Sequence, residues 1–257
     1  MDDFNERFGG LARLYGRDGL ARLQKSHVAI IGIGGVGVWT AEALARSGVG
    51  ALTLVDLDEL CVTNINRQLH ALTATVGRAK VDVMAERIRA INPHCRVTTL
   101  QEFFNDQSAG KILAAKFDFV VDAIDNVANK VLLLALCVAG KTPVVSCGAA
   151  GGRRDGTAVR LADLGHVTHD RLFAEVRKRL RERHNFPAAG RVTGVMCAFS
   201  AEVPVFAQVD GSVGAERCAA DKDSRLSCNG GLGSATFVTG AFGFAAAGFV
   251  VKQLAGE

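Results

Sequence analysis

The chain has 257 residues, of which 49% are apolar, and its formal net charge is +4. This length and apolar content suffice for one sizeable core, so we expect a single continuous domain over residues 1–257. The seven cysteines are scattered and never spaced C-x-x-C, which argues against a disulfide framework and a structural zinc site. Reduced thiols of this kind favour a cytoplasmic protein.

Strand-forming and helix-forming stretches alternate through the first 150 residues. This order is typical of a Rossmann-like α/β fold, a doubly wound and mostly parallel sheet with helices on both faces. The first strand is predicted at residues 27–31 (HVAII), and the helical sequence WTAEALARSG follows a short glycine-rich turn.

That turn, GIGGVG at residues 32–37, fills a G-x-G-x-x-G pattern with Gly32, Gly34 and Gly37. Glycines at these positions permit a tight turn and a close approach of the backbone to phosphate, at the amino end of a helix. The pattern alone is weak evidence. Its place between a strand and a helix makes it a candidate nucleotide site.

Polar residues follow the second predicted strand, ALTLVD. Asp56 ends this strand 24 residues after Gly32, where an acid can bind ribose hydroxyls. Beyond it come Asp58, Asn64, Asn66, Arg67 and Gln68, and Lys80 begins the next helix. A hydride-transfer site has little use for such a cluster, whereas phosphates do, because arginine can fork onto their oxygens. The alternative for Lys80 is an exposed helix lysine.

The fourth predicted strand, FDFVVDAIDN, carries Asp122, Asp125 and Asn126 at its carboxyl end. Ligands bind at this edge of an open α/β sheet. We expect Asp125 to hold Mg²⁺ against phosphates, since Mg²⁺ usually takes one or two carboxylates and substrate oxygens. Asp122 has a structural alternative, in which it bonds a neighbouring loop.

The positive charge is concentrated between residues 171 and 191, which hold seven Lys/Arg and two Glu. The run AEVRKRLRER predicts a helix within this stretch. Candidate nucleic-acid-binding residues are Arg177, Lys178, Arg181 and Arg183, with Arg153 and Arg154 as a second cluster. The charge pattern permits two interpretations, a solvated helix face and an electrostatic footprint for nucleic acid.

Residues 232–251 carry no charge over about the length that crosses a bilayer. Small residues such as Gly240, Gly243 and Gly248 dominate the segment. They favour a terminal helix packed in a core or subunit interface, with membrane association as the alternative.

Four ordered motifs, GIGGVG, DLDELCVTNINRQ, VGRAKVDVMAERIRAINP and VVDAIDN, resemble the adenylation domain of the ubiquitin-activating enzyme superfamily and its bacterial sulfur-carrier-activating relatives. The resemblance implies that a carboxylate attacks the α-phosphate of ATP. By position it implies that Gly35 and Asp56 line an ATP site, that Asn64, Arg67 and Lys80 contact the phosphates, and that Asp125 holds Mg²⁺. With the neighbouring glycines and polar residues, the candidate ATP site comprises Gly32, Gly34, Gly35, Gly37, Asp56, Asp58, Asn64, Asn66, Arg67, Gln68, Lys80, Asp125 and Asn126. In this interpretation residues 1–147 are the nucleotide-binding core, and residues 148–257 bind substrate and mediate dimerisation.

The C-terminal half contains CGAAGGRRDGT, RVTGVMCAFSAE and RLSCNGGLGSATFVTGAFGF, and the chain opens with RFGGLARLYG. Together these resemble the tRNA threonylcarbamoyladenosine dehydratase branch of the superfamily. That branch implies tRNA as partner and an ATP-dependent cyclisation, next to the anticodon, with net loss of water. The alternatives are activation of a ubiquitin-like sulfur carrier, which the missing C-x-x-C pairs disfavour, and an NAD-binding redox module.

The resemblance also implies a homodimer, in which Arg13 is our candidate for the arginine that reaches the partner's site. Cys228 is a candidate thiol for a cysteine desulfurase or sulfur-acceptor system, with a small, buried, unreactive cysteine as the alternative. We expect Cys61 to be buried by packing. Whether a monovalent cation, Na⁺ or K⁺, binds the Gly-rich C-terminal loops is left open.

Overall fold

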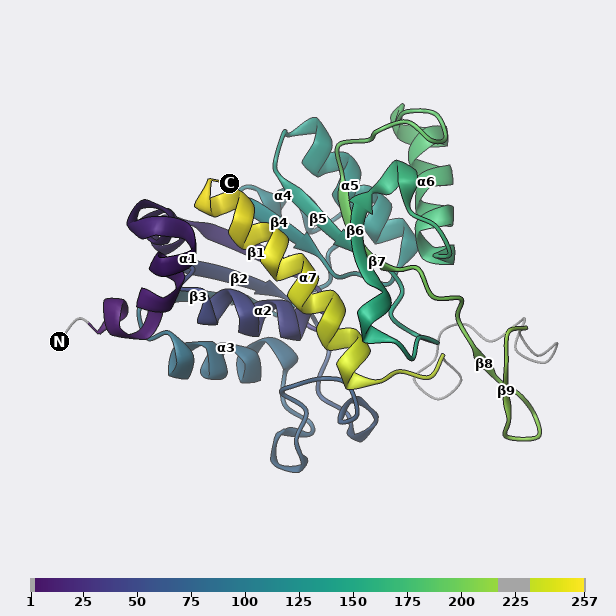
Figure 1. Cartoon of the computed structure of the whole chain (residues 1–257), viewed down its shortest axis with the longest axis horizontal. Coiled ribbons are helices and arrows are strands. Elements are labelled where there is room, and N and C mark those ends of the chain that lie inside the picture. Colours follow the sequence, from purple (N-terminus) through teal and green to yellow (C-terminus); the bar gives the residue numbers. More distant parts are fainter. Residues whose placement is uncertain (1–2, 217–231, 257) are drawn as a thin grey trace.

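Seven strands form one sheet in the computed structural model, which describes residues 3–216 and 232–256. Their order across the sheet is β3-β2-β1-β4-β5-β7-β6 (Figure 1). The strands are β1 His27–Ile31, β2 Ala51–Val55, β3 Arg96–Leu100, β4 Phe119–Asp122, β5 Val144–Cys147, β6 Val159–Asp163 and β7 Met196–Ser200. Every pairing is parallel except that of β6 with β7, so the predicted Rossmann-like fold is confirmed.

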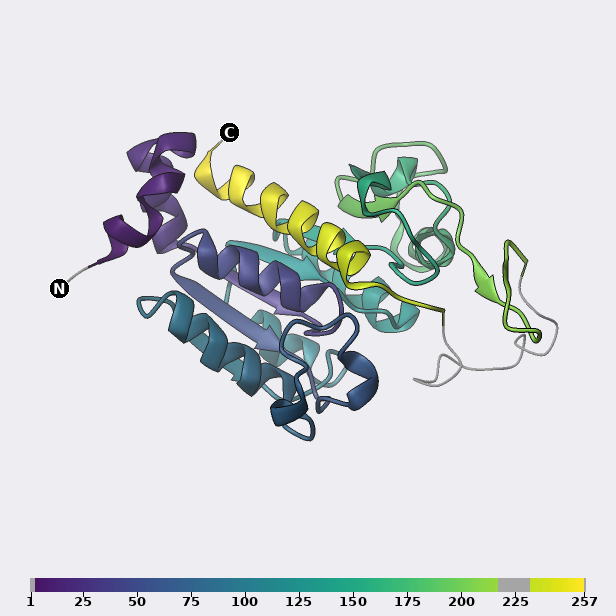
Figure 2. The ribbon, with the colours of Figure 1, turned by 60° about the horizontal axis from the view of Figure 1, so that its bottom comes forward.

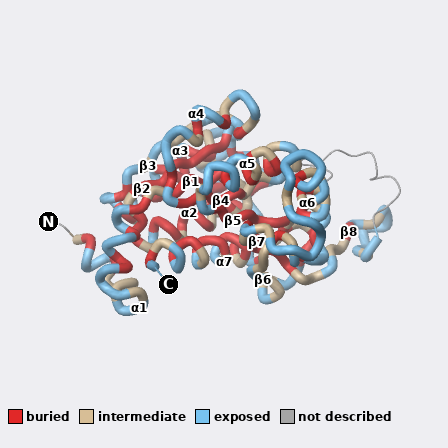
Figure 3. Tube along the Cα trace, turned by 90° about the horizontal axis from the view of Figure 1, so that it is seen from above, coloured by how far each residue is buried: buried red, intermediate tan, exposed pale blue. Residues whose placement is uncertain are grey.

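Helices cover both faces of this sheet. On one face lie α2 Gly37–Arg46, α3 Lys80–Ile91 and α7 Thr236–Ala255, and on the other α4 Ala109–Leu113, α5 Val127–Ala139 and α6 Arg171–His184. Each face has its own apolar cluster, and Figure 3 shows the strands buried between helices whose outer sides are exposed. Burial on both faces explains why the central strands are almost entirely apolar.

The remaining elements lie around this core. The amino-terminal helix α1 (Phe4–Lys25) leads directly into β1 and bends at Gly16, where φ is 74°. Short 3-10 turns are η1 Val62–Asn64, η2 Thr73–Thr75, η3 Gly156–Ala158 and η4 Leu164–His166. A small hairpin of β8 (Phe206–Ala207) and β9 (Val213–Gly214) stands out from the body of the molecule in Figure 2.

The terminal helix α7 packs across α2, α1 and strands β5 to β7. A Cβ atom on Gly243 would lie 2.6 Å from Cβ of Trp39 and 2.8 Å from the carbonyl oxygen of Val36. The prediction of a helix that packs through small residues is therefore confirmed. Among the described helices, α7 is long and apolar enough to cross a membrane by length and composition, yet half of its most apolar stretch is buried in the protein.

Candidate nucleotide site

The glycine loop lies where β1 ends and α2 begins, at the carboxyl edge of the sheet. Gly32 has φ of 95°, and a Cβ there would lie 2.8 Å from the carbonyl oxygen of Ala123. A Cβ on Gly37 would lie 1.8 Å from the carbonyl oxygen of Gly32. Both positions therefore require glycine for close packing of strand and helix. A Cβ on Gly34 meets no atom within 4 Å, so this peptide has open space beside it.

Asp56, at the end of β2, ties the glycine loop to its neighbours. Its Oδ2 accepts a hydrogen bond from the backbone N–H of Ile33 at 2.7 Å, and its Oδ1 accepts one from Asp58 at 2.9 Å. Burial raises the pKa of this carboxyl, and the nearby Lys80 ammonium opposes that shift. The carboxyl group thus sets the position of the loop at the place expected for a ribose-binding acid.

Lys80 is buried at the start of α3, with only 6% of its surface exposed. The ammonium Nζ donates to Oδ2 of Asp58 at 2.7 Å and lies 4.0 Å from Oδ1 of Asp56. The exposed-lysine alternative is therefore wrong. The pair of carboxylates holds a cation beside the glycine loop, although Asp58 itself is exposed.

In the loop from Asn64 to Gln68, some side chains hold the local structure and others are accessible to a ligand. Asn64 is buried, and its Oδ1 accepts a hydrogen bond from the backbone N–H of Cys61 at 3.1 Å, which closes η1. Asn66 is exposed and Arg67 half-buried, and Nη1 of Arg67 donates to the carbonyl oxygen of Thr63 at 2.6 Å. Cys61 is exposed, so the expectation that packing buries it was wrong.

Two buried side chains in the same loop have polar atoms without a hydrogen-bond partner. They are Gln68, through Oε1, and His70, through both ring nitrogens. Burial lowers the pKa of His70 to about 4, and the charge of Lys80 contributes to that shift. His70 was missed from the sequence, because one histidine in a polar loop gives no signal of its burial.

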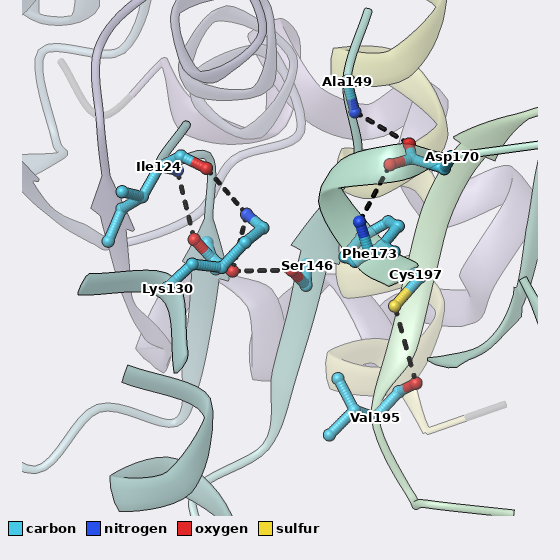
Figure 4. Close-up of polar contacts among 9 residues, drawn as sticks. Ile124, Lys130, Ser146, Ala149, Asp170, Phe173, Val195 and Cys197 are labelled. Atoms are coloured by element: carbon cyan, nitrogen blue, oxygen red, sulfur yellow. Dashed lines mark hydrogen bonds and ion pairs between the residues drawn. The ribbon is translucent and has the colours of Figure 1, made fainter. Parts of the chain in front are cut away.

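The two aspartates at the end of β4 have opposite surroundings. Asp122 is fully buried, with Oδ2 2.8 Å from Nζ of the equally buried Lys130 and 2.5 Å from Oγ of Ser146, which donates to it. Its structural alternative is confirmed, because Oδ1 also accepts the backbone N–H of Ile124 at 3.1 Å. Nζ of Lys130 donates to the carbonyl oxygen of Ile124 at 2.8 Å (Figure 4).

The ion pair therefore fixes the loop that carries Asp125, which is exposed. Asn126 caps α5, since its Oδ1 accepts from the backbone N–H groups of Ala128 and Asn129 at 3.0 and 3.2 Å. Sequence reasoning missed Lys130. Its signal was a single charged residue in the otherwise apolar helix VANKVLLLALCVA, which has to find a partner when buried.

The candidate tRNA-binding residues divide by burial. Exposed members are Arg154, Lys178, Arg181 and Arg183. Arg177 is half-buried and its Nη1 donates to the carbonyl oxygens of Leu164 and Val167 at 3.2 and 2.9 Å. The expectation that Arg153 is available to bind tRNA was wrong, because this residue is only 3% exposed and donates to the carbonyl oxygens of Glu202 and His169. Its buried guanidinium holds two loops together and is not available on the surface.

Asp170 joins α6, the helix that carries most of the basic candidates, to the sheet. Its Oδ1 accepts the backbone N–H of Phe173 at 2.9 Å, capping α6, and its Oδ2 accepts that of Ala149 at 2.9 Å, just after β5 (Figure 4). A Cβ on Gly148 would lie 2.2 Å from this Oδ2. These contacts hold the amino end of α6 against the loop that follows β5.

Of the two remaining site candidates, Arg13 lies apart from the glycine loop. Arg13 is exposed on α1, which leads into the amino end of β1, whereas the loop lies at the carboxyl end. Cys228 lies outside the described residues, as does most of the Gly-rich loop considered for a monovalent cation. No group of three or more His, Cys, Asp or Glu that could hold a metal occurs within residues 3–216 and 232–256.

A model of the ThiF family matches residues 9–256 of the chain. This chain belongs to the ThiF family. It is 45% identical over 255 residues to the tRNA threonylcarbamoyladenosine dehydratase of Escherichia coli, covering 98% of this chain and 95% of that one. The Haemophilus influenzae dehydratase is 43% identical over 255 residues, covering 99% and 95%.

A solved structure of the Escherichia coli dehydratase in complex with ATP is similar along nearly the whole chain. Its TM-score is 0.87 at 41% identity, covering 99% of this chain and 96% of that one. In contrast, the Escherichia coli molybdopterin-synthase adenylyltransferase is 41% identical over 133 residues, or 52% of this chain. The end-to-end similarity supports the dehydratase interpretation over sulfur-carrier activation.

Proposed function

We propose that this chain catalyses the ATP-dependent dehydration of threonylcarbamoyladenosine next to the anticodon of tRNA, by adenylating the carboxylate of the modified base. The end-to-end similarity to dehydratases carries the proposal. The buried Lys80 beside the glycine loop, with Arg67 and Asp125 on neighbouring loops of the same sheet edge, supports a phosphate-handling site.

Adenylation converts a poor leaving group into a good one. A carboxylate oxygen of the base attacks the α-phosphorus of ATP, and the bond to pyrophosphate breaks. Arg67 and Lys80 would stabilise the charge that builds on the phosphate oxygens, which is electrostatic and positional catalysis. The backbone N–H groups at the start of α2 would face the phosphates, helped by the positive end of the helix.

Magnesium fits this site as a partner of Asp125. The exposed carboxylate lies at the end of a loop that Asp122 and Lys130 hold in place. One carboxylate plus phosphate oxygens is a usual Mg²⁺ environment. When bound, Mg²⁺ would neutralise phosphate charge, while Asp125 fixes the position of that charge.

The second step closes a ring. A nitrogen or oxygen within the same modified base attacks the acyl carbon and loses its proton, and the bond to AMP breaks. The original carboxylate oxygen leaves with AMP, so the base has lost the elements of one water molecule. No covalent intermediate with the enzyme is needed, and Cys228 has no step in this scheme.

The tRNA would bind the basic surface made of Arg154, Lys178, Arg181 and Arg183. These side chains are exposed. Asp170 ties α6, which carries Lys178, Arg181 and Arg183, to the loop that leaves β5, and Arg154 lies on the loop before η3. Phosphate contacts of this kind supply affinity without reading sequence.

We also propose a cytoplasmic homodimer. Phe237 and Phe244 of α7 are 62% and 51% exposed, which leaves apolar surface for a second subunit. Arg13 lies at the opposite end of the sheet from its own glycine loop, so it would act on the partner's nucleotide.

The proposal is tested by following AMP formation from ATP labelled in the α-phosphate. We expect tRNA that carries threonylcarbamoyladenosine to stimulate AMP formation, and the same tRNA without the modification to leave it unchanged. Stimulation by a ubiquitin-like carrier protein in place of tRNA would overturn the proposal and favour sulfur-carrier activation.

A further inference from the structure

The backbone of Arg67 is held by side chains from two helices. Its carbonyl oxygen accepts hydrogen bonds from Nε1 of Trp39 in α2 and from Oγ1 of Thr239 in α7, each at 3.2 Å. Thr239 lies 172 residues further along the chain and is 2% exposed. The terminal helix therefore contacts a residue that the proposed function assigns to the phosphates.

Thr239 also packs under the glycine loop. A Cβ on Gly35 would lie 3.3 Å from Cγ2 of Thr239 and 3.6 Å from Cγ and Cδ of Arg67. Three segments meet here, the glycine loop, the loop after η1 and the first turn of α7. A shift of Thr239 would consequently move the backbone of Arg67 relative to the loop that faces phosphate.

A second contact joins the same two segments. Nδ2 of Asn66 donates to the carbonyl oxygen of Ser234 at 2.8 Å, just before α7. Oδ1 of Asn66 accepts from Nη1 of Arg67 at 3.2 Å. Both the backbone and the guanidinium of Arg67 are thus connected to the start of α7.

We propose that Thr239 is a positioning residue that sets Arg67 against the phosphates of ATP, so that the amino end of α7 is part of the nucleotide site. This inference rests on the proposed function, because it assigns Arg67 to phosphate. The single hydroxyl hydrogen of Thr239 is shared between the carbonyl oxygen of Arg67 and that of Thr236, which lies at 3.1 Å, and a purely structural role would use the Thr236 contact alone. In the positioning role, Thr239 affects ATP binding only through Arg67, whereas in the structural role it affects ATP binding without Arg67.

The experiment measures the Kd of a non-hydrolysable ATP analogue by titration calorimetry with Mg²⁺ present. Thr239→Val keeps the branched shape and the methyl group but removes the donor, so we expect binding roughly fivefold weaker, the effect of one neutral hydrogen bond. Thr239→Ser keeps the hydroxyl and should retain wild-type binding. Should Thr239→Val fail to fold, Thr239→Ala removes the same donor, together with the methyl group that packs beside Gly35.

Thr40→Val is the matched control. Thr40 is fully buried, and its Oγ1 donates to the carbonyl oxygen of Gly243 at 3.2 Å, so it joins α2 to α7 without contacting Arg67. We expect this variant to lose stability similar to that of Thr239→Val while its Kd stays at the wild-type value.

A double-mutant cycle with Arg67→Ala decides between the roles. We expect Thr239→Val to have no further effect on Kd once Arg67 is alanine. An equal loss in both backgrounds would overturn the inference and leave the proposed function intact. Absence of analogue binding by the wild-type protein would overturn both.

Discussion

The carboxyl edge of the sheet and the outer surface of α6 both collect charged side chains, but they use them differently. At the sheet edge several charges are buried and interlocked, as the contacts of Asp56, Lys80 and the Asp122–Lys130 pair show. On α6, Lys178, Arg181 and Arg183 are exposed. The first arrangement fixes the positions of individual charged groups, whereas the second spreads positive charge over an exposed surface. A single substitution at the sheet edge should therefore change activity or stability strongly. Substitutions on α6 should each have a small effect on tRNA binding, and these effects should add.

The largest effect should come from Asp125→Asn, which keeps the shape of the side chain but removes its charge. We expect tRNA-dependent AMP formation to fall on the order of a hundredfold or more, because a charge aimed at the reacting phosphates is lost. Single-turnover assays with saturating tRNA provide the measurement.

Asp118→Asn is the control for this variant, since Asp118 lies just before the amino end of the same strand and bonds the backbone N–H of His27 at 2.8 Å. Equal losses in the two variants would mean that Asp125 has no special role.

Lys130→Met should be the most damaging change to stability. It leaves Asp122 buried without its cation, and we expect the free energy of unfolding to fall by about 3–5 kcal/mol. Adding Asp122→Leu should recover a substantial part of that loss, because no uncompensated charge remains. Urea titration of both variants checks this, and a double variant as unstable as the single one would show that the charge is not the cause.

Charge reversal at Arg181 and Arg183 should weaken tRNA binding roughly tenfold at low salt and reduce the slope of log affinity against log salt by about two. The matched variant reverses two exposed lysines, Lys116 and Lys141, which lie before the amino ends of β4 and β5. Filter binding across a salt series compares them. The same loss in both variants would favour net charge over a defined surface.

A last effect, confined to acid conditions, concerns pH and stability. Burial lowers the pKa of His70 to about 4, below the ordinary value of 6.5, so the unfolded chain binds a proton that the folded one does not. Stability from this group is present above about pH 6.5 and is lost as pH falls toward 4, by up to about 1.4 kcal/mol per pH unit. His70→Leu should flatten the pH dependence of urea unfolding over that range, and an unchanged slope would contradict the assignment.

Most of the fold follows from local sequence. Apolar runs of strand length, a glycine turn and helical sequence specify the β1–loop–α2 unit, since each element carries its own signal. The small side chains in the segment 232–251 likewise indicated close helix packing. Neither pattern identifies the contact between Thr239 and Arg67, because that contact depends on how two distant segments meet.

The site could be predicted only in part, since burial decides what identical residue types do. Asp122 and Asp125 lie three positions apart, yet one is fully buried and the other exposed. Arg153 and Arg154 are adjacent, and only Arg154 is exposed. Charge patterns indicate the region, whereas tertiary packing separates structural from available groups.

The central claim is most directly tested by mass spectrometry of nucleosides from tRNA carrying threonylcarbamoyladenosine, after incubation with enzyme, ATP and Mg²⁺. We expect that nucleoside to lose the mass of one water molecule with the wild-type protein, and to keep its mass with Arg67→Ala. An unchanged mass with wild-type protein that binds ATP would contradict the dehydratase function.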